Sequence, residues 1–267
     1  MPNSFNSGKV SEYMSEVEGF EWPSPIGLES SLSELEQESR GNYIADIGAG
    51  RGKLARYIAE RNSDSYVIGT DISPGFLGSD VRSSQGLDNL DFVVGEGTDM
   101  LRQGSADTVY MINMIQATGN PFEHITEAYD ILNEGGKLVV TVPGPESLSN
   151  WPEKAKVIDS TEEQLTYLST PVSTENHSFV NEQFVIPVEE FRKEAKDIGF
   201  NVRDEVPEEI AFNPRGFPAM IDVIEEGYEP DMPEELVNQL RENPDKTTEK
   251  LLESGNIRKV DKWVLEK

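Results

Sequence analysis

Short apolar runs alternate with helix-like patterns from residue 42 onward. Five runs of three or four apolar residues stand out, at 43–45, 66–68, 92–94, 109–112 and 138–140. Unbroken runs of this length are typical of strands that are buried on both faces of a parallel sheet. Between them, apolar residues recur at helical spacing, as at Leu54, Tyr57 and Ile58. The alternation predicts right-handed βαβ units in a mostly parallel, doubly wound α/β sheet with helices on both faces.

The remaining segments suggest how the domain is extended. Residues 1–40 are predicted to form an N-terminal helical extension, since leucines recur at helical spacing within a predicted helix at 27–39. Residues 41–267 form the main domain. Two insertions interrupt it, a segment of mixed helix and loop at about 144–185 and a helical segment at about 213–257.

The last elements complete a sheet of seven strands. A helical stripe is expected to end at Gly199, followed by a sixth strand over 200–206 and a closing strand over 260–265. The pair Gly135-Gly136 is expected to stop the helix before the fifth strand, because glycine often ends helices. The first insertion follows the fifth strand and therefore is expected to cap a substrate site at the carboxyl edge of the sheet.

Composition excludes several chemistries. The chain has no cysteine, so it has no disulfides, thiolate metal sites or cysteine nucleophile, and no metal site is predicted. Its 50 Asp and Glu against 23 Lys and Arg give a net charge of −27, which disfavours contact with nucleic acid or anionic membranes. This charge indicates either a cationic partner or, as we favour, halophilic adaptation to a salty cytoplasm. The apolar runs are too short to span a bilayer, and we expect a soluble cytoplasmic protein.

The segment after the first predicted strand contains the most informative motif. Gly48, Gly50 and Gly52 are spaced as G-x-G-x-G, whereas dinucleotide sites have G-x-G-x-x-G. Asp46 stands just before the first glycine, where it would repel a pyrophosphate and attract a cationic amine. Asp71 ends the second predicted strand, where an acid can accept hydrogen bonds from both hydroxyls of a ribose. The spacing and the position of Asp46 therefore disfavour a nicotinamide-dependent oxidoreductase.

This arrangement resembles the class I S-adenosylmethionine-dependent methyltransferases of Rossmann-like fold, over about residues 42–142. The resemblance implies S-adenosylmethionine as cofactor. It implies that Asp46, Gly48, Ala49, Gly50 and Gly52 hold the methionine part, that Asp71 binds the ribose and that Ile72 packs on the adenine. Glu96 and Gly97 take the place of the family's Asp-Ala pair at the adenine amino group, and Asn113 completes the expected set of cofactor-binding residues.

The sequence identifies the reaction class more clearly than the acceptor. Transfer from a sulfonium is an in-line displacement that depends mainly on alignment, so no fixed catalytic residue is expected. His177, in the first insertion, is a candidate base, whereas His124 is expected to face solvent. The side chains of Tyr110, Asn113 and Gln116 are expected to be within reach of the acceptor.

The acceptor is expected to be a small molecule. Residues 112–116 lack the Asn/Asp-Pro-Pro-aromatic run of methylases that act on exocyclic base amines, and the sequence shows no basic helix for RNA. The alternatives are an RNA or protein acceptor, or a catalytically inactive methyltransferase-like protein that acts as a binding or scaffold subunit.

Overall fold

The computed structural model describes most of the predicted sheet and its helices. The described residues are 29–50, 52–72, 74, 77, 86–95, 97–118, 120–142, 156–160, 166–173, 178–204, 207–211 and 259–267. The helices are α2 (Glu29–Glu36), α3 (Lys53–Arg61), the 3-10 helix η4 (Ile115–Ala117), α5 (Pro121–Ile131) and α6 (Val188–Ile198). The strands are β1 (Tyr43–Ile47), β2 (Tyr66–Asp71), β3 (Leu90–Val94), β4 (Ala106–Ile112), β5 (Leu132–Val142), β6 (Lys156–Ser160), β7 (Thr166–Ser173), β8 (Ser178–Val185), β9 (Asn201–Val202), β10 (Glu208–Ala211) and β11 (Lys259–Glu266).

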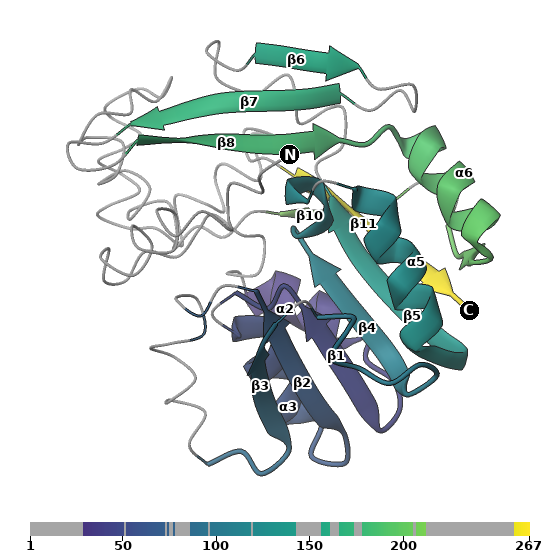
Figure 1. Ribbon diagram of the computed structural model, residues 1–267. Coiled ribbons are helices and arrows are strands. Elements are labelled where there is room, and N and C mark those ends of the chain that lie inside the picture. The colour runs from purple at the N-terminus through teal and green to yellow at the C-terminus, as the bar shows by residue number, and fades with distance from the viewer. Residues whose placement is uncertain are drawn as a thin grey trace.

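The main sheet has the predicted doubly wound, mostly parallel topology (Figure 1). Its order is β10-β11-β5-β4-β1-β2-β3, with β1 to β5 parallel and β11 antiparallel to β5. Seven strand positions were expected, and the sixth is divided between the short strands β9 and β10, which both pair with β11. The strand order reverses between β1 and β4, and in such sheets ligands bind outside the carboxyl ends of the strands at this point.

Two apolar clusters, one on each face of the sheet, form the core. The first contains apolar residues of α5 and α6 with inward residues of β4, β5 and β11. The second contains apolar residues of α2 and α3 with the opposite side chains of β1, β4 and β5. The apolar strand runs arise from this burial on both faces, as the sequence indicated.

The first insertion differs from its prediction. Strands β6, β7 and β8 form a separate antiparallel sheet with order β6-β7-β8, whereas mixed helix and loop were expected. In Figure 1 this small sheet lies beyond the carboxyl ends of β4 and β5, and β8 contacts η4. The first insertion therefore contains a sheet, and its role as a substrate cap stays a prediction. The second insertion, at about 213–257, lies outside the described residues.

Gly135-Gly136 does not stop a helix. Helix α5 ends earlier, at Ile131, and β5 begins at the next residue. Ala106 of β4 pairs with Leu132 of β5, but Thr108, two residues later, pairs with Lys137, five residues later. The extra residues of β5, which include both glycines, therefore form a bulge. The backbones of Gly135 and Gly136 bond instead to that of Lys267 at the end of β11. The predicted stop at Gly199 is confirmed, because α6 ends there and Gly199 has a φ of 123°.

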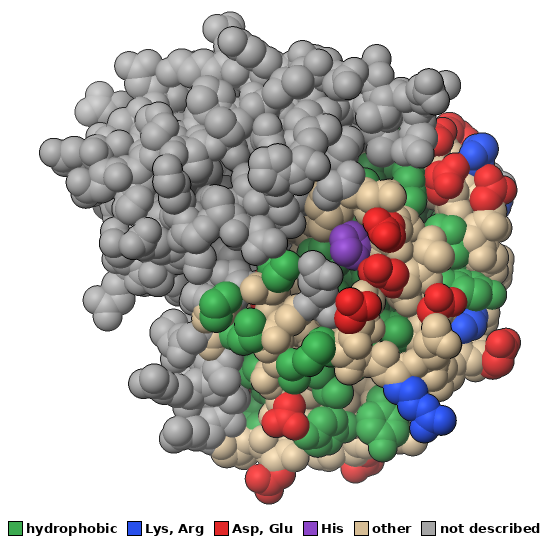
Figure 2. All heavy atoms as spheres, viewed as in Figure 1, with side chains coloured by type: hydrophobic (Ala, Val, Ile, Leu, Met, Phe, Trp, Pro, Cys, Tyr) green, Lys and Arg blue, Asp and Glu red, His purple; other side chains and the backbone are tan. Residues whose placement is uncertain are grey.

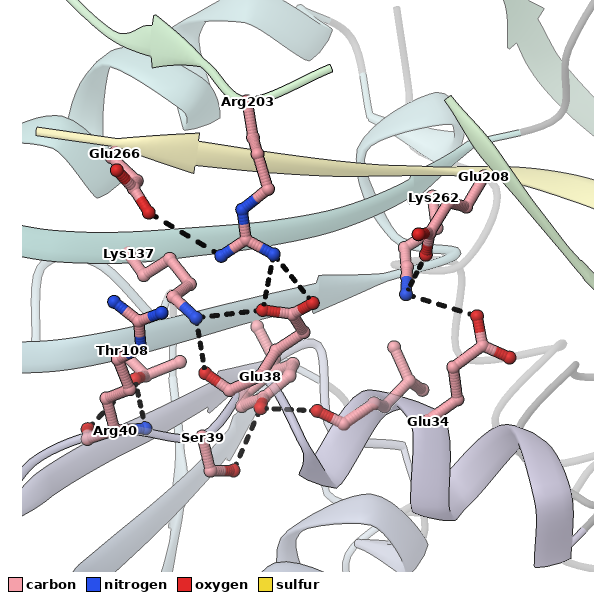
Figure 3. Close-up of polar contacts among 12 residues, drawn as sticks. Glu34, Glu38, Ser39, Arg40, Thr108, Lys137, Arg203, Glu208, Lys262 and Glu266 are labelled. Carbon is pink, nitrogen blue, oxygen red and sulfur yellow. Dashed lines mark hydrogen bonds and ion pairs between the residues drawn. The ribbon is translucent and has the colours of Figure 1, made fainter. Parts of the chain in front are cut away.

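Helix α2 is fastened to the sheet by two buried lysines (Figure 3). Lys137 of β5 lies 2.8 Å from Glu38, and this carboxylate also pairs with Arg203 at 2.8 Å. Lys262 of β11 lies 3.1 Å from Glu34 on the helix and also pairs with Glu208 of β10. Both lysine side chains are 2% exposed. The helix therefore covers these charges as well as part of the apolar face.

The described surface is strongly acidic. Figure 2 shows Asp and Glu side chains scattered over the visible face, with few Lys and Arg among them. Within the described ranges, the helices are too short or too polar to cross a bilayer. The cytoplasmic location and the adaptation to salt stay predictions.

Candidate cofactor site

The glycine loop connects β1 to α3 and is held against the end of β2. The amides of Gly48 and Ala49 both donate to the carbonyl of Thr70, each at 2.8 Å, and Gly52 donates to the carbonyl of Ala49 at 2.8 Å. The three glycines have φ values between 55° and 73°, a region that favours glycine. A tight turn is therefore fixed at the carboxyl end of the first strand.

The loop has two packed sides and one open side. A Cβ on Gly48 would collide with Met114, and one on Gly52 would collide with Phe92 of β3. By contrast, a Cβ on Gly50 would meet no atom of the described residues within 4 Å. The backbone of Gly50 is therefore exposed on this side, so a ligand could approach the chain closely there.

Asp71 connects this loop to the second strand. It is the last residue of β2, and its Oδ2 accepts a hydrogen bond from the amide of Gly50 at 2.9 Å. Ile72 follows it and is half-buried. The structure therefore brings the predicted ribose acid into direct contact with the glycine loop, a contact that the sequence did not predict.

Asp46 lies beneath the loop and is deeply buried. Its Oδ2 has no hydrogen-bond partner among the described residues. Burial raises the pKa of its carboxyl to about 7; a hydrogen bond from the Ala55 backbone partly opposes this rise, and the charge of Asp71 adds to it. Two neighbouring acidic groups give the ends of β1 and β2 a negative potential that suits a cationic ligand.

The end of β3 borders the same region. The amide of Gly95 donates to the carbonyl of Asp71 at 3.0 Å. A Cβ on Gly97 would collide with Thr70 and Ile47, so this segment passes tightly over the ends of β1 and β2. Gly97 is therefore close to the loop, as expected, whereas Glu96 lies outside the described residues.

The end of β4 forms the opposite border. Asn113 has a φ of 51°, the one positive value of a non-glycine residue in the described part of the chain. Its amide donates to the Thr141 carbonyl at 3.2 Å and hydroxyl at 3.0 Å, which anchors the turn to β5. Such backbone strain is frequent at functional sites, because the surrounding structure must enforce it. Met114 then packs against Gly48.

Residues 45–140 match the family model described as a methyltransferase domain, and the match includes part of β1, the glycine loop, β2 to β4 and most of β5. Residues 45–140 are thus assigned to the methyltransferase domain family. No curated protein is detectably similar to it in sequence. This match agrees with the predicted enzyme class and is compatible with the predicted cofactor, S-adenosylmethionine.

Solved structures of distant methyltransferases share the fold. A 1,6-didemethyltoxoflavin-N1-methyltransferase from Burkholderia thailandensis, with bound S-adenosylhomocysteine, is 11% identical with a TM-score of 0.58, over 99% of this chain and 87% of that one. A methyltransferase from Mesorhizobium loti is 17% identical with a TM-score of 0.55, over 89% and 96% of the two chains. Phosphoethanolamine N-methyltransferase 2 from Haemonchus contortus, with bound S-adenosylmethionine, is 17% identical with a TM-score of 0.55, over 95% and 57%.

Tyr110 is not placed where the sequence suggested. In the methyltransferase its side chain is fully buried under α2, and its hydroxyl bonds to the Leu35 carbonyl at 2.8 Å and to Ser39 at 2.9 Å. Burial raises its pKa above the usual range of tyrosine. Tyr110 therefore supports the N-terminal helix and does not reach an acceptor.

The other acceptor-side candidates have different environments. Gln116, in η4, is 4% exposed, and its Oε1 has no hydrogen-bond partner within the described ranges. His124 was expected to face solvent, but it is half-buried on α5 and its Nδ1 lies 3.0 Å from Glu127. His177 lies outside the described residues, so its role as a base stays a prediction.

Proposed function

We propose that this methyltransferase transfers the methyl group of S-adenosylmethionine to a small molecule held between the glycine-loop edge of the main sheet and the β6–β8 sheet. The observation that carries the proposal is the contact of β8 with η4, which follows β4 beside the glycine loop. A second layer at this edge would enclose an acceptor near the cofactor.

The described residues fit the cofactor. The bare backbone at Gly50, with the unpartnered oxygen of Asp46 below it, would hold the cationic methionine part. Asp71 would accept from the ribose hydroxyls while it keeps its bond to Gly50. Ile72 and Gly97 would border the adenine, and Gly48, Ala49, Gly52 and Asn113 would shape the walls. The cofactor supplies the activated methyl group, and these residues fix its direction toward the acceptor.

Charge and architecture favour a small acceptor over a nucleic acid. The net charge of −27 opposes binding of a polyanion, and the visible acidic side chains are distributed without a basic stripe in the described part of the face (Figure 2). Two of the methyltransferases with the same fold are named for small nitrogen-containing acceptors, which is compatible with this proposal.

Two measurements test the proposal in sequence. Calorimetric titration with S-adenosylmethionine should show one binding site, and binding should be lost or weakened in Asp71→Ala but kept in the exposed-site control Asp64→Ala. Methyl-labelled cofactor is then incubated with small-molecule, RNA and protein fractions of a cell extract. Label is expected in the small-molecule fraction. Label only in RNA or protein would overturn the proposed acceptor class, and cofactor binding with no transfer to any fraction would instead support a scaffold role.

A further inference from the structure

The segment that follows β3 is held at three points around the proposed cofactor site. Its first residue, Gly95, donates its amide to the carbonyl of Asp71 at 3.0 Å. Gly97 is pressed against Ile47 and Thr70, where no side chain would fit. These two contacts fix one side of the segment to the ends of β1 and β2.

The third point of attachment is a side chain of helix α5. The hydroxyl of Thr98, a residue only 9% exposed, donates to Oε2 of Glu127 at 2.7 Å. The same carboxylate oxygen lies 3.0 Å from Nδ1 of His124, one turn earlier on α5. The Glu127 carboxylate thus contacts the side chains of Thr98 and His124, and it links the segment after β3 to α5.

This carboxylate is placed by a rigid helix. The apolar side of α5 is anchored in the core by Phe122, Ile125 and Ala128, all of them buried. The preceding Asn120 caps the helix by accepting from the amide of Glu123 at 3.4 Å. A helix fixed in this way presents Glu127 at a defined place, and the near-buried Thr98 hydroxyl would lose its partner if that carboxylate were removed.

We propose that Glu127 is a positioning residue for the adenine end of the cofactor, acting through Thr98 on the segment 95–98. This inference rests on the proposed function, because it takes that segment as the adenine border. Glu127 does not need to touch the cofactor: its hydrogen bond holds Thr98 so that the backbone of Gly97 stays against β1 and β2. His124 contacts the same carboxylate oxygen and helps to orient it.

The test compares Thr98→Val, Glu127→Ala and Glu127→Gln with Glu123→Ala, a control at an exposed position of the same helix. Calorimetry measures affinity for S-adenosylhomocysteine and for 5′-methylthioadenosine, which keeps the adenosine and lacks the amino acid. Thr98→Val and Glu127→Ala should weaken both ligands by about 3- to 10-fold, the range that corresponds to the loss of one intramolecular hydrogen bond. Glu127→Gln retains an acceptor oxygen and should restore affinity to within about 2-fold, and Glu123→Ala should bind as the wild type does.

Hydrogen exchange measured without ligand supplies a second readout. Amides of 95–101 should exchange faster in Thr98→Val and Glu127→Ala, while amides of the glycine loop remain unchanged. The double variant should be no weaker than either single variant, because both remove the same contact. Wild-type affinity in both single variants would overturn the inference while leaving the proposed function in place. Failure of the wild type to bind either ligand would instead overturn the cofactor site itself.

Discussion

Replacing Asp46 with asparagine should make the protein more stable at neutral pH and worse at binding its cofactor. The carboxylate is buried, and one of its oxygens has no hydrogen-bond partner among the residues that the structure describes. Its pKa is raised to about 7 by burial, with a smaller contribution from Asp71. Asparagine has nearly the same shape, and its carbonyl oxygen can still accept from the Ala55 backbone. The substitution therefore removes mainly the charge.

The magnitude follows from the difference in proton affinity between the two states. In the unfolded chain Asp46 ionises with the ordinary aspartate pKa of 3.8, whereas the folded protein retains the proton up to about pH 7. Folding is therefore penalised progressively as pH rises from about 4 to 7, and the penalty is constant above that range. At about 1.4 kcal/mol for each pH unit, the largest stability gain of Asp46→Asn is about 4 kcal/mol.

Urea denaturation at constant high salt, from pH 4.5 to 8.5, measures this gain. The free energy of unfolding of Asp46→Asn minus that of the wild type should rise toward pH 7 and then level off, while the exposed-site control Asp64→Asn should show no such rise. In calorimetry the same variant should bind S-adenosylmethionine about 10- to 100-fold more weakly, because a charge-assisted contact is lost. A variant that is less stable than the wild type at pH 8, or a difference that does not change with pH, would refute the reasoning.

Three further outcomes are expected. Asp71→Ala should weaken S-adenosylmethionine binding by about 1.5–3 kcal/mol in calorimetry, since it removes ribose contacts and the bond to Gly50; unchanged affinity would remove Asp71 from the site. Glu38→Gln should lower the free energy of unfolding in urea by about 3 kcal/mol at pH 7, because it leaves Lys137 buried without its counter-charge. Burial alone would raise the pKa of Glu38, but Lys137 and Arg203 together hold it below the usual value, so this stabilisation should disappear as pH falls below about 4.5; a loss no larger than that of the exposed-site control Glu60→Gln would contradict it. The melting temperature of the wild type, measured by circular dichroism, should rise steeply from low to molar salt, because salt screens the repulsion of the acidic surface; a flat curve would count against the adaptation to salt.

The parts of the fold that sequence predicted correctly are those specified by neighbouring residues. Apolar runs identified β1 to β5; β1, β4 and β5 carry buried side chains on both faces, whereas the edge strand β3 is only partly buried. The glycine loop was recognised from its spacing after the first run. The polar strands β6 to β8 gave no such signal. Residues 166–173, for example, read TYLSTPVS, a segment whose strand structure depends on pairing with β6 and β8.

Long-range polar contacts were equally hidden. Lys137 and Lys262 interrupt apolar strands, and no neighbouring residue indicates their partners. The partner of Lys137 lies 99 residues away, just after α2, and that of Lys262 lies 228 residues away, on α2. The bond of Gly50 to Asp71 and the burial of Tyr110 under the same helix also depend on chain segments brought together only by folding. For the candidate site, the sequence could supply the candidate residues but not the contacts that hold them.

The attachment of α2 has a practical consequence for dissecting the protein. The region recognised as a methyltransferase domain begins at residue 45 and ends at 140, so a fragment with those limits would omit Glu34, Glu38 and β11. Such a fragment would retain the ammonium group of Lys137 but lose the Glu38 carboxylate that neutralises it, on a face stripped of its covering helix. We therefore expect a recombinant fragment that folds by itself to extend at least from α2 to β11, beyond the limits of the recognised domain.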